Sequence, residues 1–128
     1  MEEFIRDHLA KIVAGDEQAM LGTVAEDFVQ EWPQTGEMVR GRQACMNVMA
    51  NYPGGPPQIE MGRISGEGDH WVVESTTTYP GGDVYHVMTA IEFRDGLLVR
   101  QTDYFGPEFP APEWRQQWVE PIEPADRG

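Results

Sequence analysis

The sequence predicts a single α+β domain in which helices cover the concave face of a curved antiparallel sheet. Helical patterns are confined to the first third of the chain, whereas the second half consists of β-type runs separated by tight-turn residues. A chain of 128 residues is long enough for one hydrophobic core with space for a small cavity. Helices followed by consecutive strands favour an α+β layer architecture.

Three helices are expected before the strands. Apolar residues recur at i, i+4 and i+8 from Phe4 to Val13, on one helix face. Gly15 ends this pattern, and Asp16 is a suitable N-cap for a second helix reaching about Val24. A third helix is expected over residues 42–51, before a Pro- and Gly-rich break.

Five strands are expected. Residues 28–32 read as a short strand that ends at Pro33. Four more runs rich in Val, Ile, Thr, Tyr and Phe cover residues 58–65, 70–79, 84–94 and 97–105. Because the segments between these four runs have tight-turn compositions, we expect an antiparallel meander.

Turn lengths predict which residues share a face of this meander. A two-residue loop at Asp95-Gly96 would place Asp103 opposite Met88. A turn of two or four residues after Tyr79 would then place Ser75 on the same face. The predicted face comprises Val73, Ser75, Thr77, Tyr79, His86, Met88, Ala90, Gln101, Asp103 and Phe105.

This face mixes apolar residues with a few polar groups, as small-molecule pockets do. Asp103 is the candidate proton-transfer group, with His86 as its partner. The alternative for Asp103 is a structural carboxylate that accepts hydrogen bonds from neighbouring donors. Residues expected to contact the substrate are Trp32, Ser75, Thr77, Tyr79, Met88, Gln101, Phe105 and His8. The opposite face is too apolar for full solvation and suits a homodimer interface.

Composition restricts the partners. Acidic residues outnumber basic ones by 22 to 9, which disfavours nucleic acid and anionic membrane surfaces. The chain has one cysteine, no cluster typical of a metal site and no phosphate-binding glycine loop, so neither a metal nor a cofactor is expected. An acidic N-terminus without a long apolar run predicts a cytoplasmic protein.

The element order, together with the segments 93–96 and 101–105, resembles the SnoaL-like branch of the nuclear transport factor 2-like superfamily. The resemblance covers about residues 3–106, and the entry to the third helix at residues 39–44 also fits it. It implies a cone-shaped domain with an internal pocket, usually dimeric through the outer sheet face. The remaining residues 107–128 form a Pro-rich extension in which Trp114 and Trp118 could pack on the helices or cap the cone.

Relatives in this branch differ in their chemistry, so the resemblance is carried over residue by residue. In limonene epoxide hydrolase-like members, the partners of the Asp103 equivalent are charged, whereas here they fall on Ser75 and Thr77. In ketosteroid isomerase-like members, the base position corresponds to Trp32, beside Glu31. Polyketide cyclase-like members use an Asp and a His on the last two strands, which correspond in kind to Asp103 and His86.

Two functions are therefore compatible with the sequence. The first is a cofactor-independent acid–base enzyme of the cyclase, isomerase or dehydratase type, acting on an apolar carbonyl-bearing substrate. The alternative is a non-catalytic ligand-binding or accessory dimer that uses the same pocket. The environment of Asp103 distinguishes them, because a carboxylate whose oxygens are fully occupied by donors favours binding.

Overall fold

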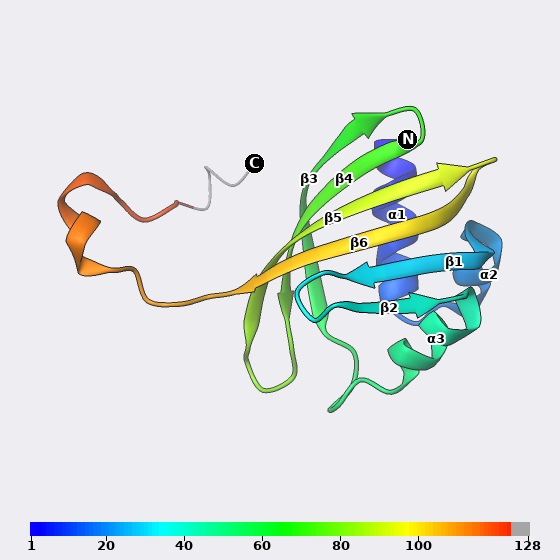
Figure 1. Ribbon diagram of the computed structural model, residues 1–128, viewed down its shortest axis with the longest axis horizontal. Coiled ribbons are helices and arrows are strands. Elements are labelled where there is room, and N and C mark those ends of the chain that lie inside the picture. Colours follow the sequence, from blue (N-terminus) through cyan, green and yellow to red (C-terminus); the bar gives the residue numbers. More distant parts are fainter. Residues whose placement is uncertain (124–128) are drawn as a thin grey trace.

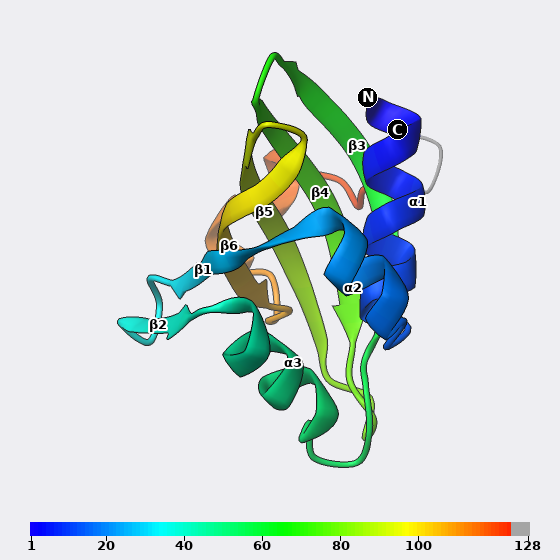
Figure 2. The ribbon, with the colours of Figure 1, turned by 90° about the vertical axis from the view of Figure 1, so that its right-hand side faces the viewer.

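The computed structural model describes residues 1–123, and its six strands form one sheet. The sheet is curved, with the helices on one side (Figures 1 and 2). The helices are α1 (Glu2–Val13), α2 (Glu17–Thr23) and α3 (Arg42–Ala50), followed near the C-terminus by a 3₁₀ helix, η1 (Glu113–Trp118). The strands are β1 (Val24–Trp32), β2 (Glu37–Arg40), β3 (Gln58–Glu67), β4 (His70–Thr78), β5 (Val84–Arg94) and β6 (Leu97–Pro107).

The sheet has the strand order β2-β1-β6-β5-β4-β3. The predicted meander from β3 to β6 is present and antiparallel, but β1 pairs with β6 in parallel, so the sheet is mixed. No hairpin joins β1 to β6, and their relative direction is therefore not constrained by a turn. Strand β2 was not expected; it pairs with β1 across the turn that follows Trp32.

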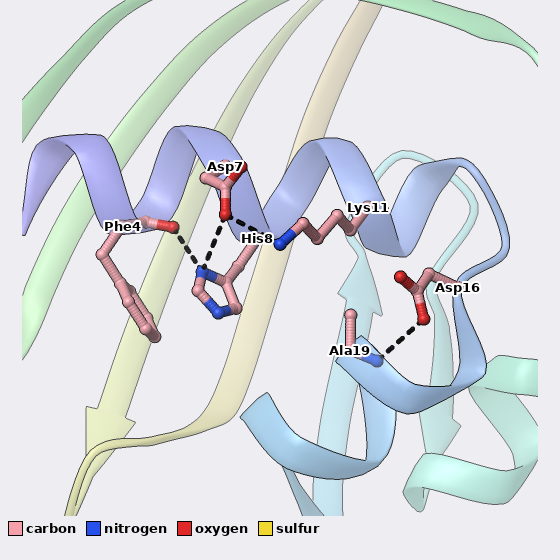
Figure 3. Close-up of polar contacts among 6 residues, drawn as sticks. All are labelled: Phe4, Asp7, His8, Lys11, Asp16 and Ala19. Carbon is pink, nitrogen blue, oxygen red and sulfur yellow. Dashed lines mark hydrogen bonds and ion pairs between the residues drawn. The ribbon is translucent and has the colours of Figure 1, made fainter.

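The core lies between the concave face of the sheet and the helices. Helix α1 packs against β3, and α3 packs against β1 and β2. Ile5 and Ile12 of α1 and Cys45 of α3 are buried, as the helical spacing predicts. Asp16 caps α2 by accepting a 3.1 Å hydrogen bond from the backbone nitrogen of Ala19 (Figure 3).

The strand register differs from the predicted one at two places. The Asp95-Gly96 turn is as predicted, with Arg94 opposite Leu97 and positive φ angles of 53° and 79°. An irregularity after Leu98 then shifts the β5–β6 pairing by one residue. The β4–β5 turn has three residues, because Tyr79 N donates to Asp83 O at 2.9 Å.

Because of these shifts, the β5 side chains predicted to face the cavity point to the opposite side of the sheet. Asp103 lies opposite Thr89, not Met88, and His86 pairs with Gly106. His86, Met88 and Ala90 therefore lie on the outer face, because side chains alternate along a strand. Ser75 still lies on the same face as Asp103. The β5–β6 and β4–β5 pairings are each offset by one residue, so the second offset restores the predicted face on β4.

The chain after β6 leaves the body of the domain (Figure 1). Trp114 and Trp118 were expected to pack on the helices or cap the cone, but their exposed fractions are 73% and 72%. No residue of the described part of this extension, 107–123, lines the internal cavity. The expected extension includes residues 124–128, which lie outside the described residues.

Candidate ligand-binding site

A cavity of about 540 Å³ lies between the concave face of the sheet and the helices. This volume is within the range of small-molecule sites and exceeds that of a few water molecules. Its walls are mainly apolar, with contributions from α1, α2, α3 and every strand of the sheet. Of the predicted site residues, Trp32, Ser75, Thr77, Tyr79, Gln101, Asp103 and Phe105 line it.

Asp103 is the centre of a polar cluster within this cavity. Its carboxylate accepts hydrogen bonds at one oxygen from Gln30 Nε2 (2.7 Å) and Trp32 Nε1 (3.1 Å). The other oxygen accepts from Thr89 Oγ1 (2.9 Å) and Gln101 Nε2 (3.0 Å). Four donors match the four acceptor positions of a carboxylate, and only 9% of Asp103 is exposed.

Three strands hold this cluster together. Gln30 and Trp32 are two residues apart on β1 and therefore point to the same face. Gln101 and Asp103 have the same relationship on β6, which pairs directly with β1. Thr89 completes the cluster from β5, where it lies opposite Asp103. All four donors are uncharged, so the cluster orients the carboxylate without neutralising it.

The residues that sequence reasoning did not place in this site include Gln30, Thr89 and Tyr52. Gln30 follows from strand alternation once Trp32 is placed in the pocket. Thr89 follows only from the shifted register of β5. Tyr52 lies between α3 and β3, in a segment whose position no sequence pattern indicates.

The aromatic residues Tyr52, Tyr79 and Phe105 line the cavity, and Tyr85 links the last two through ring contacts. The rings of Tyr52 and Tyr79 are 6.1 Å apart, and Tyr79 meets Tyr85 edge-on at 5.5 Å. Tyr85 in turn meets Phe105 edge-on at 6.0 Å. Burial, followed by Tyr79 and Asp103, raises the pKa of Tyr52 to about 12, so its hydroxyl stays protonated at neutral pH.

The pKa of Tyr79 is raised as well, first by burial and then by Tyr85 and Asp103. Burial and then the charge of Asp103 raise the pKa of the Cys45 thiol to about 11. Two phenols and a thiol around a carboxylate therefore stay neutral to a higher pH than these groups usually do. Such groups can donate hydrogen bonds to the oxygen of a ligand.

His86 and Met88 were predicted to face the pocket and do not. The Nε2 atom of His86 lies 2.9 Å from Glu108 Oε2, and 51% of Met88 is exposed. The cyclase-like pairing of Asp103 with His86 is therefore not formed. The pairing is absent because the one-residue shift between β5 and β6 places His86 on the outer face of the sheet.

His8 does not line the cavity either. Its ring stacks on Phe4 with 3.9 Å between centroids, and Nδ1 lies 2.9 Å from the carbonyl oxygen of Phe4 (Figure 3). The neighbouring Asp7 forms its closer ion pair with Lys11, at 3.1 Å. His8 is thus a helix-surface residue with local partners.

Glu31, the acid next to the isomerase base position, points away from the cavity and pairs with Arg100. Within residues 1–123, no group of three His, Cys, Asp or Glu side chains is placed to hold a metal ion. Across the same residues, no helix is long and apolar enough to span a membrane.

Comparison with known proteins agrees with the fold described above. The profile of the SnoaL-like domain matches residues 5–101. No curated protein matches the chain. The structure is similar to an NTF-2-like protein of unknown function from Burkholderia xenovorans, with 36% identity, coverage of 95% of this chain and 98% of that one, and a TM-score of 0.79.

A second similar structure is from Kribbella flavida and is described as a "putative ketosteroid isomerase". The two chains share 26% identity, and the superposition covers 92% of this chain and 86% of that one with a TM-score of 0.80. An NTF2-like protein of unknown function from Mesorhizobium loti shares the fold at 22% identity, with a TM-score of 0.69 and coverage of 82% and 89%.

Proposed function

Because this chain belongs to the SnoaL-like domain family, we propose that it binds a small, mainly apolar molecule with oxygen functions inside its cavity. The observation that carries this proposal is the cavity of about 540 Å³ with one polar cluster on its floor. Apolar walls supply affinity through burial, whereas Gln30, Gln101 and the tyrosine hydroxyls supply orientation.

The hydrogen bonding of Asp103 supports binding over proton transfer. Both of its oxygens are occupied, so taking up a proton requires the loss of a bond from Gln30, Trp32, Thr89 or Gln101. Asp103 then acts as a positioning residue that orients two glutamine amides. In each amide, the second N–H and the carbonyl oxygen are available to a ligand.

Ligand binding is tested by thermal-shift measurements with a panel of uncharged ring compounds that carry ketone or hydroxyl groups. A matched variant, Ser75→Trp, places a large side chain in the cavity, while Thr76→Trp places it on the outer face of the same strand. We expect stabilisation of the unaltered protein and of Thr76→Trp, and its loss in Ser75→Trp. Equal stabilisation of all three proteins would place binding outside the cavity.

A second candidate function is an isomerase-type acid–base enzyme, favoured by the 26% identity to the Kribbella flavida protein. In this case Asp103 exchanges one of its donors for the substrate during proton transfer. The test is turnover of apolar carbonyl compounds by the unaltered protein and by Asp103→Asn. A loss of about a hundredfold or more supports this function, whereas equal turnover removes Asp103 from the mechanism.

We also propose that two copies associate through the outer sheet face. Met88 and Tyr104 form a cross-strand pair on this face, and each is 51% exposed. Large apolar side chains that are paired and exposed at the centre of a sheet are typical of interfaces.

A further inference from the structure

The charged side chains around the cavity all carry the same sign. Asp103 lies on its floor, and Asp16, Glu17 and Glu37 also line it. Among residues 1–123, no lysine, arginine or histidine lines it. An anion that enters this space therefore meets acidic groups without a compensating cation.

Three arginines on elements that line the cavity hold contacts elsewhere. Arg42 of α3 donates to the carbonyl oxygen of Val24 at 3.0 Å. Arg6 of α1 donates to the carbonyl oxygen of Gly62 at 2.9 Å, and Arg100 pairs with Glu31 on the outer face. Moving any of them into the cavity would break an existing contact.

The negative charge of Asp103 acts on other groups around the cavity. Its four hydrogen-bond donors are neutral, so they stabilise the carboxylate without cancelling its charge. After burial, Asp103 contributes to raising the pKa values of Cys45, Tyr52 and Tyr79, which surround it. Apolar walls weaken dielectric screening and thereby extend the reach of this field.

We infer that the cavity selects its ligand by charge, accepting uncharged or cationic ring compounds and excluding anionic ones. This inference rests on the proposed ligand-binding function and narrows its ligand class. Neutral hydroxyl and carbonyl groups can pair with the glutamine amides and the tyrosine hydroxyls. A protonated amine is in addition attracted by Asp103 and by the faces of the aromatic rings. A carboxylate, sulfonate or phosphate finds the same neutral donors but no cation, and Asp103 repels its charge.

The test uses three compounds with one skeleton: 2-naphthalenemethanol, 2-naphthylmethylamine and 2-naphthoate. At about pH 7 their charges are zero, positive and negative, respectively. Each is titrated into the unaltered protein and followed by NMR through the indole N–H signal of Trp32, which lies beside Asp103. We expect the carboxylate to bind at least roughly tenfold more weakly than the alcohol, and the amine at least as tightly as the alcohol.

Two variants assign the effect to the cavity. Asp103→Asn removes the charge on the floor, whereas Glu92→Gln removes one charge from the outer face. We expect the ratio of the carboxylate's Kd to the alcohol's Kd to fall at least threefold in Asp103→Asn. In Glu92→Gln we expect this ratio to stay as in the unaltered protein. The comparison of the three compounds on the unaltered protein stands even if Asp103→Asn does not fold.

The outcomes separate the inference from the proposed function. If the carboxylate binds as tightly as the alcohol and shifts the Trp32 signal, charge selection is wrong and ligand binding stands. If no compound binds, or if Ser75→Trp leaves all affinities unchanged, both are wrong. If Asp103→Asn folds and the ratio of the two Kd values is unchanged, Asp103 has no role in the selection.

Discussion

Thr89 and Asp103 lie directly opposite each other on β5 and β6, and Thr89 Oγ1 donates a 2.9 Å hydrogen bond to Asp103. Both side chains are buried in the floor of the cavity. This contact places Thr89 on the face that was predicted to hold Met88. It also fills the last acceptor position of the carboxylate, and this occupancy supports the positioning role proposed for Asp103.

The contact between Thr89 and Asp103 gives the first prediction. Thr89→Val keeps the shape of the side chain and removes its donor, which leaves a buried charged acceptor one bond short. We expect the free energy of unfolding to fall by about 1–3 kcal/mol. Urea unfolding followed by circular dichroism measures it. The control Thr102→Val lies on the outer face of β6, and a loss as large there would contradict the argument.

Cys45 is predicted to be an unreactive thiol. Burial and then Asp103 raise its pKa from 9 to about 11, which lowers the thiolate fraction at pH 8 roughly a hundredfold. We expect alkylation by iodoacetamide to be slower than in the urea-unfolded chain by at least this factor. Mass spectrometry gives both rates, and comparable rates would show that the thiol is accessible and ionised. Because the folded-state pKa is raised, this group contributes stability below pH 9 that is lost toward pH 11.

Tyr52 is predicted to ionise above the usual range. Its pKa is raised from 10 to about 12, so its stabilising contribution is present below pH 10 and is lost as pH rises toward 12. We expect Tyr52→Phe to remove a late step in the absorbance titration of the tyrosines. Between pH 10 and pH 12, the free energy of unfolding should also fall less in Tyr52→Phe than in the unaltered protein. An unchanged titration curve would contradict the assignment.

Association through the outer face predicts a change in oligomeric state. Met88→Glu combined with Tyr104→Glu introduces charge at the centre of the proposed interface, where burial of a carboxylate is unfavourable. We expect a homodimer for the unaltered protein and a monomer for the double variant. Sedimentation velocity measures both. Leu21→Glu, an equally apolar-to-acidic change at an exposed position of α2, serves as the control and should remain dimeric.

Much of the fold could be predicted because its signals are local. The α1 periodicity, the Asp16 cap and the Asp95-Gly96 turn each depend on a few neighbouring residues, and each is present in the structure. The cavity-facing side of β4 and β6, including Ser75 and Asp103, was also predicted. For β4 this succeeded because two one-residue shifts cancel, not because each turn was read correctly.

The parts that the sequence left open depend on contacts between distant residues. Whether β6 carries an irregularity after Leu98 is decided by its pairing with both β5 and β1, and this decides whether His86 or Thr89 joins Asp103. The position of Tyr52 depends in the same way on how the chain returns from α3 to β3. By itself, therefore, the sequence determined the helices, the meander and one acid facing a pocket. Only the tertiary structure decided that four donors from three strands occupy that acid, because their hydrogen bonds span up to 73 residues of chain.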